Sequence, residues 1–172
     1  AYLYHDLDAE LASTIANPME LPEKGTRELV AEDFVYGIKR IASPRVVSPV
    51  LGVLAEHMPG LKALNAELAA RDKALRAQDG EEAWLDLRTS PLEGVRALDS
   101  HTLEITIRGK YTQFGNWLAM AFFAPVPWEA ERVYANGALA RNNVTLASWP
   151  VGTGPYMLVE SRQNREHDMR RH

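Results

Sequence analysis

Two hydrophobic periodicities alternate along this chain without a regular rhythm, and they constrain its fold more than any other feature. Residues 27–44, RELVAEDFVYGIKRIASP, place apolar side chains at helical spacing. Residues 102–108 alternate apolar and polar side chains, as a half-buried strand does. A fold built from βαβ units would repeat strand and helix in regular order, and this chain does not. The sequence therefore predicts an α+β fold.

The clearest predicted helix lies within residues 27–44. Glu32 and Asp33 are in its first turn and Lys39 and Arg40 in its last, so the charges match the helix dipole at both ends. Proline lacks the N–H that a continuing helix needs. We therefore expect this helix to end before Pro44.

Residues 61–77 form a second clear pattern, rich in Ala, Leu, Lys and Glu, with an intermittent stripe of leucines. They predict a surface helix, which residues 78–86 either extend or link to the next element. Residues 10–16 begin at most one helical turn. Further helices are expected over residues 49–57, 111–121 and 128–136, the last ended by Gly137, and strands over residues 2–5, 95–98, 102–108 and 156–160.

Composition excludes several classes of function. The net charge is -4, and basic residues are interspersed with acidic ones, so no basic face for nucleic acid is expected. The chain has no cysteine, which excludes disulfides, thiol nucleophiles and cysteine zinc sites. No apolar run approaches the roughly 20 residues that span a bilayer, and the start lacks a signal-peptide pattern.

Motifs for catalysis or cofactor binding are weak. His5, Asp6 and Asp8 could ligate a metal, but no second histidine follows at i+4, and a solvated loop is the favoured interpretation. Residues 152–154, Gly-Thr-Gly, precede a strand and lack the Lys-Ser or Lys-Thr of a phosphate loop. No serine has the flanking glycines of a nucleophile elbow. We therefore expect no enzyme activity, no cofactor and no metal.

An aromatic stretch runs through Trp117, Met120, Phe122, Phe123 and Trp128. Such a stretch is more often core than pocket. Residue chemistry by itself thus predicts a soluble α+β domain and leaves its function open.

Five strings occur in a fixed order: RELVAEDFVYGIKR, ASPRVVSP, VRALDSHTLEITIRG, FFAPVPWEA and PVGTGPYMLVE. In order and approximate spacing they resemble the bacterial extracellular solute-binding proteins of family 5, the group of the oligopeptide- and dipeptide-binding proteins. The resemblance covers about residues 27–160, most of the chain. It rests on the five strings together, since no single one would suffice.

The resemblance implies a fragment of a two-lobed fold of the periplasmic-binding-protein type II-like class, mainly the smaller subdomain of the first lobe. Residues 1–126 are expected to form this subdomain with an incomplete N-terminus. Residues 127–172 are expected to form a truncated return segment into the main sheet of that lobe. The two ends of the chain, AYLYHDLD and QNREHDMRRH, fit this expectation of a piece cut from a longer chain.

The function that the resemblance implies is that of the substrate-binding component of a bacterial ABC importer. Such a protein captures a peptide or a similar small solute by closing its lobes, without covalent chemistry, and delivers it to a membrane permease. The implied location is periplasmic, or extracytoplasmic with a lipid anchor, and the full-length protein is expected to be monomeric.

Ligand contacts carried over from the family fall on altered residues. The oligopeptide receptor has a tyrosine after the Ser-Pro that resembles Ser48-Pro49, and this chain has Val50 there. A histidine of the family corresponds to Met120. Both replacements remove a polar group, so a more apolar ligand is expected, with Val50, Met120 and Phe122 as one wall of the cleft. Val30 also replaces the usual capping threonine, which weakens the cap of the following helix.

Two rival functions remain open from the sequence. The first is a helical interaction module in which the leucine stripe of residues 61–77 meets a protein partner without any small ligand. The second is an enzyme domain with a metal at His5, Asp6 and Asp8.

Overall fold

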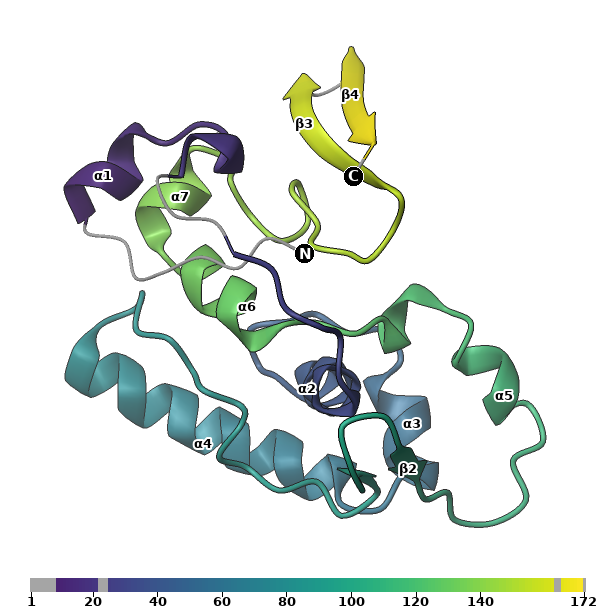
Figure 1. The fold of residues 1–172 in the computed structure, drawn as a ribbon. Helices are drawn as coiled ribbons and strands as arrows, with labels where there is room; N and C mark the ends of the chain where they lie inside the picture. Colours follow the sequence, from purple (N-terminus) through teal and green to yellow (C-terminus); the bar gives the residue numbers. More distant parts are fainter. Residues whose placement is uncertain (1–8, 22–24, 163–164, 172) are drawn as a thin grey trace. The chain divides into compact units, whose positions relative to one another are not determined.

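The chain has two compact units in the computed structural model, which describes residues 9–21, 25–162 and 165–171 (Figure 1). The central unit is Leu29–Trp128, and the terminal unit consists of the described residues before Leu29 together with those from Glu129 onward. The sequence predicted a subdomain over residues 1–126 and a return segment over residues 127–172, and this division stays a prediction. The strand expected over residues 2–5 lies outside the described residues.

Helix α2 (Ala31–Ile41) forms the centre of the Leu29–Trp128 unit, as expected from its periodicity. It contacts the β1–β2 hairpin (Val95–Ala97 and Leu103–Ile105) and the 3-10 helix η2 (Ala121–Phe123). The N-cap residue Val30 gives no side-chain cap, as predicted. The Asp33 carboxylate instead accepts a hydrogen bond from the Val30 N–H at 3.0 Å, which satisfies one of the exposed donors at this end.

Helices α3 (Leu51–His57) and α4 (Leu61–Asp79) pack against each other and confirm two predicted helices. Gly60 has φ +81°, a conformation that favours glycine, and it lets the chain turn directly into α4. The chain after α4 is not helical, so residues 78–86 are mainly a link rather than an extension. The leucines that α4 buries in the core of the central unit are Leu61, Leu64 and Leu68.

The predicted hairpin is confirmed, since β1 and β2 pair antiparallel with Arg96 opposite Glu104. The helix expected over residues 111–121 is much shorter: α5 covers only Phe114–Trp117, and η2 follows after a turn. Trp117 donates from Nε1 to the Tyr111 hydroxyl at 2.6 Å, which holds the irregular segment before α5.

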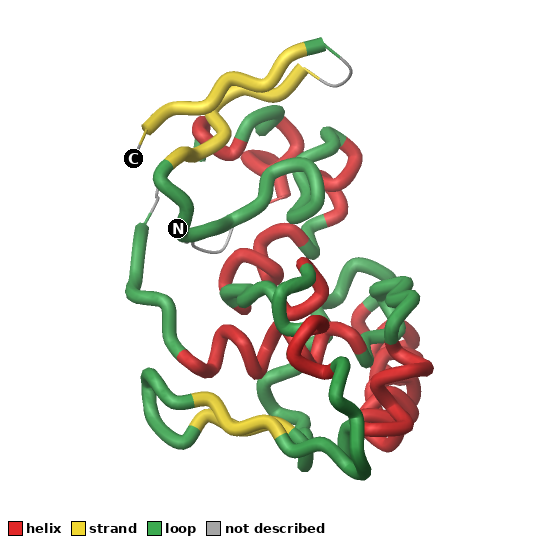
Figure 2. Tube along the Cα trace, turned by 90° about the vertical axis from the view of Figure 1, so that its right-hand side faces the viewer, coloured by secondary structure: helices red, strands yellow, loops and turns green. Residues whose placement is uncertain are grey.

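The terminal unit packs short helices around Leu139 and Trp149, beside the antiparallel hairpin β3–β4 (Tyr156–Arg162 and Glu166–Arg171). Figure 2 shows the two hairpins of the described residues as paired strands. The sequence predicted β3 and missed β4, whose residues are all exposed and carry no alternating apolar pattern. The helices of this unit are α1 (Ala9–Thr14), η1 (Pro18–Glu20), α7 (Gly137–Arg141) and all of α6 (Trp128–Tyr134) except its first residue, which belongs to the central unit.

The prediction that Gly137 ends the helix over residues 128–136 is wrong. Helix α6 stops at Tyr134, and Gly137 is the first residue of α7. Asn136 accepts the Ala138 N–H on its side-chain oxygen at 2.9 Å, so it is the N-cap of a new helix. Asn-Gly here marks a helix start, because the capping side chain satisfies a free N–H that a continuing helix would not have.

Candidate ligand pocket

A pocket of about 200 Å³ opens in the central unit beside α2. Three segments form its walls: the C-terminal half of α2, the loop before α3, and η2 with the residues that follow it. We call it the α2 pocket. Its lining is mainly apolar and consists of Gly37, Arg40, Ile41, Val46, Val47, Ser48, Pro49, Ala121, Phe122, Ala124 and Val126.

Gly37 determines how closely the η2 wall approaches α2. A Cβ atom at this position would lie 2.5 Å from the Ala124 carbonyl oxygen, which is shorter than any normal contact. The Val126 N–H also donates to the Asp33 carbonyl of α2 at 3.0 Å. Glycine in the middle of a helix lowers helix stability, but here it allows a close backbone contact that fixes one side of the pocket.

The η2 wall is positioned by two neighbouring phenylalanines with opposite roles. Phe123 is buried in the core and meets the ring of Phe114 edge-on, with centroids 5.9 Å apart. Phe122 lines the pocket and is 38% exposed. The buried Phe123 thus anchors η2, so that Phe122 is held in the wall of the pocket.

The third wall is the loop over residues 46–49. Val50, which follows this loop, is the N-cap residue of α3. Its side chain is only 5% exposed and packs in the core, so it fixes the end of the loop. Val46 donates its N–H to the Ser43 carbonyl at 3.2 Å. Val47, in contrast, is 99% exposed. The Ser48 Oγ is buried and has no hydrogen-bond partner among the residues that the structure describes.

The structure places the three predicted ligand residues differently from one another. Phe122 lines the α2 pocket. Met120 lies directly before η2 and is 48% exposed, outside the lining. Val50 is in the core behind the loop. The sequence reasoning missed Ser48 and Gly37, although Ser48 stood in a quoted string and a glycine inside a predicted helix is a signal of close packing.

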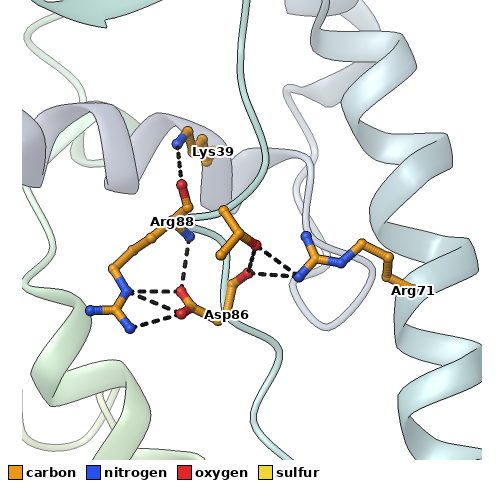
Figure 3. Close-up of polar contacts among 5 residues, drawn as sticks. Lys39, Arg71, Asp86 and Arg88 are labelled. Atoms are coloured by element: carbon orange, nitrogen blue, oxygen red, sulfur yellow. Dashed lines mark hydrogen bonds and ion pairs between the residues drawn. The ribbon is translucent and has the colours of Figure 1, made fainter.

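The opposite side of α2 carries polar contacts instead of a pocket (Figure 3). Lys39 is two residues from Gly37 and therefore about 200° away around the helix. Its Nζ donates to the Arg88 carbonyl at 3.4 Å, and the Arg88 guanidinium pairs with Asp86 at 2.8 Å. Arg71 of α4 donates to the Asp86 carbonyl at 3.2 Å. These contacts tie the segment after α4 to both α2 and α4.

Aromatic contacts reinforce the same polar cluster. The Arg88 guanidinium carbon lies 3.6 Å from the centroid of Trp128 and 5.3 Å from that of Trp84. The two tryptophan rings stack with centroids 5.9 Å apart. Cation–π contacts of this kind stabilise a fold by roughly 0.5–2 kcal/mol. We interpret this side of α2 as structural.

The pKa shifts in this cluster have clear physical causes. Burial lowers the pKa of the Lys39 ammonium, and the carboxylates of Glu32 and Asp86 oppose this effect. Burial acts to raise the pKa of Asp86, but the hydrogen bonds from Arg88 and the positive charges of Arg88 and Arg71 together lower it below its ordinary value of 3.8. Asp86 is therefore held as a carboxylate that pairs with Arg88.

A second cavity, of about 370 Å³, lies in the terminal unit and is also mostly apolar. Pro18 and Met19 of η1, the turn before β3, and exposed side chains of the β3–β4 hairpin such as Tyr156 and Met169 form its walls. No predicted ligand residue lies there. Within residues 9–21, 25–162 and 165–171, no group of three or more His, Cys, Asp or Glu side chains could hold a metal ion. His5, Asp6 and Asp8 lie outside these described residues.

No helix in the described part of the chain is both long and apolar enough to cross a membrane. A search of curated proteins found no match. Among solved structures, the murein tripeptide binding protein MppA of Escherichia coli is similar to this chain, with a TM-score of 0.55 and 23% sequence identity. The match covers 84% of this chain and 24% of MppA, so the chain spans about a quarter of that protein.

This structural likeness establishes the fold: the mixed helices and hairpins are those of part of a periplasmic binding protein. The family model described as bacterial extracellular solute-binding proteins, family 5 Middle, matches residues 25–172. The match covers most of the chain and includes all three walls of the α2 pocket. It confirms the resemblance that the five strings indicated. The chain belongs to the bacterial extracellular solute-binding proteins of family 5.

Proposed function

We propose that this chain is part of the substrate-binding component of a bacterial ABC importer, which captures a peptide or a similar small solute and delivers it to a membrane permease. The match of the family 5 model to residues 25–172 carries this proposal. The protein works by closing around its solute, and no covalent chemistry is needed. It acts outside the cytoplasmic membrane, as a monomer, and is not an enzyme.

The α2 pocket supports the proposal by its form. Ligand sites are typically preformed concave surfaces with mostly apolar linings and a few placed polar groups. Here Gly37 and the buried Phe123 fix two walls, and Ser48 supplies a polar group. We assign Phe122 and Met120 to direct contact with the solute, and Val50 to support of the same wall from the core.

The rival interaction module loses its main argument in the structure. Its proposed docking face was the leucine stripe of residues 61–77. Leu61, Leu64 and Leu68 are at most 2% exposed, within the core of the chain's own central unit. A stripe that is already buried in this way is not available to a partner without partial unfolding.

A thermal melt of the purified full-length protein that contains residues 1–172 tests the proposal. A pool of peptides of two to five residues is added, and the same pool hydrolysed to free amino acids is the control. A ligand at about 100 times its dissociation constant adds roughly 2.7 kcal/mol to stability. We expect the intact pool to raise Tm and the hydrolysed pool to leave it unchanged. A folded protein with no shift in either pool would contradict a peptide receptor.

A further inference from the structure

We propose that the α2 pocket receives one bulky apolar group of the solute, an aromatic or branched aliphatic side chain, and that the Ser48 hydroxyl hydrogen-bonds a polar group beside it. This inference rests on the proposed function, because it states which part of the solute the pocket holds. It is carried by the size and lining of the pocket, the rigidity of its walls, and the buried hydroxyl.

The size of the pocket suits a ring or a branched chain. Its volume is about 200 Å³, and a dry cavity of about 150 Å³ lined by apolar side chains is enough to bind benzene. Ile41, Val46, Val126 and Phe122 give it an apolar surface. Arg40 also lines the pocket, so a cationic side chain would meet a like charge there.

The walls are held before any ligand arrives. The backbone contact of Gly37 with Ala124 and the hydrogen bond from Val126 to Asp33 fix η2 against α2. Val50 fixes the end of the loop in the core. A preformed site loses little conformational entropy on binding, so the burial of an apolar group contributes more fully to affinity.

Ser48 gives the pocket a specific polar requirement. Its Oγ is buried and lacks a hydrogen-bond partner within the described part of the chain. A buried hydroxyl without a partner destabilises the protein, and a ligand that supplies the missing partner recovers this loss on binding. The polar partner is a group such as the amide that adjoins a side chain in a peptide.

Two exposed apolar side chains extend the binding surface at the opening. Val47 is 99% exposed and Phe122 is 38% exposed, and both belong to the lining. Their exposure leaves apolar area that a bound side chain would remove from water. The pocket lining therefore includes both a buried hydroxyl and exposed apolar side chains.

The test uses small probes that do not require the natural solute to be a peptide. N-acetyl-phenylalaninamide, N-acetyl-alaninamide and N-acetyl-lysinamide are titrated into the purified protein that carries residues 1–172, and binding is followed by NMR chemical shifts. Because burying a phenyl side chain contributes about 1.5–3 kcal/mol, we expect the phenylalanine probe to bind about 10-fold or more tightly than the alanine probe. The lysine probe should bind no better than alanine. Equal affinity for the phenylalanine and alanine probes would overturn the proposal.

Variants locate the binding in the α2 pocket. Val47→Asp and Phe122→Ala should each weaken the phenylalanine probe by about 5-fold or more, because they remove apolar contact area. Val53→Asp is the matched control: Val53 is an exposed valine of α3 outside the lining, and its change should leave affinity unaltered. If Val53→Asp weakens binding as much as Val47→Asp, the site is elsewhere and the proposal fails.

Ser48→Ala separates a ligand-binding role from a structural one. The variant should weaken the phenylalanine probe about 2- to 10-fold, since one hydrogen bond is lost. It should also unfold at an equal or higher denaturant concentration than the wild type, since a buried hydroxyl without a partner is removed. Unchanged affinity in Ser48→Ala would overturn the role of the hydroxyl.

The outcomes distinguish this inference from the proposed function. If the phenylalanine probe binds in the α2 pocket but the peptide pool gives no thermal shift, the apolar subsite is supported and the peptide receptor is contradicted. If the peptide pool shifts Tm but the phenylalanine and alanine probes bind alike, the receptor is supported and the apolar subsite is overturned.

Discussion

The two sides of α2 differ in how they are closed. On one side Lys39 donates a hydrogen bond to the Arg88 carbonyl, and the Arg88 guanidinium contacts both Asp86 and Trp128. On the other side Gly37 admits the backbone of Ala124, and the neighbouring surface remains open as the α2 pocket. One helix thus carries a sealed polar face and an open apolar face about 200° apart.

The proposed site assignment puts solute binding on the side of α2 away from the Asp86–Arg88 pair. Charged groups such as Asp86 and Arg88 attract attention as candidates for chemistry, yet here they pair with each other and stabilise the link after α4. The open face has a glycine, a serine, Arg40 and mostly apolar side chains. A binding protein needs shape and a few placed polar groups, which that face supplies.

The largest effect is expected from the two neighbouring phenylalanines of η2. Phe123→Ala should lower the free energy of unfolding by about 3–5 kcal/mol, because it empties a core position. Phe122→Ala should cost under about 1 kcal/mol, because Phe122 is partly exposed at the pocket. Urea denaturation of both variants measures the contrast. Similar losses in the two variants would mean that Phe122 is a core residue and that the α2 pocket is closed.

The next effect concerns the contact of α2 with η2. Gly37→Ala should destabilise the protein by roughly 1–3 kcal/mol, because the new methyl group cannot fit beside the Ala124 oxygen. Gly52→Ala in α3 is the matched control, since nothing lies within 4 Å of its new methyl group. That variant should gain about 0.5–1 kcal/mol from higher helix propensity. A Gly37→Ala protein as stable as Gly52→Ala would refute the close contact.

A smaller loss is expected on the sealed side. Arg88→Ala removes the contact with Trp128 and the pair with Asp86, and should cost about 1–2 kcal/mol. Arg96→Ala, which removes an exposed pair with Glu104 in the hairpin, should cost below about 0.5 kcal/mol. Thermal and urea denaturation compare the two. If Arg88→Ala lowers the free energy of unfolding no more than Arg96→Ala does, the contacts of Arg88 do not stabilise the fold. The contrast between the two sides of α2 would then fail.

The smallest effect is a pH dependence of the same cluster. The pKa of Asp86 is lower in the folded protein than its ordinary 3.8, so its stabilisation is present above that pH and is lost as pH falls through the lowered pKa. The wild type should therefore exceed Asp86→Asn in stability at pH 6. The difference should shrink as the pH is lowered below about 3.8. A difference that stays constant from pH 6 to pH 2.5 would show that the charge of Asp86 has no role.

Elements with strong local patterns could be predicted from the sequence. The helix of residues 31–41 followed from apolar spacing and end charges, and the hairpin of residues 95–105 from alternation around a turn. Strand β4 could not be predicted, because EHDMRR is exposed throughout and is a strand only through pairing with β3. The prediction that Gly137 ends a helix was wrong for a similar reason. The Asn136 side chain caps the N-terminus of α7, so the Asn-Gly pair begins a helix.

The pocket was only partly predictable, because it is made by tertiary packing. The resemblance pointed to Phe122 and to the loop that contains Ser48-Pro49. The need for glycine at position 37 depends on the Ala124 carbonyl, 87 residues further along, and no local pattern contains it. The missing partner of the Ser48 hydroxyl is likewise visible only once its surroundings are folded.

Amide hydrogen exchange with and without the peptide pool tests the central claim most directly, because it reports on both sides of α2 at once. We predict that peptides slow exchange in residues 46–48 and 121–124, the two walls of the α2 pocket outside the helix, and leave residues 86–90 unchanged. Protection confined to residues 86–90, or no protection in a pool that raises Tm, would contradict the assignment of solute binding to the open side of the helix.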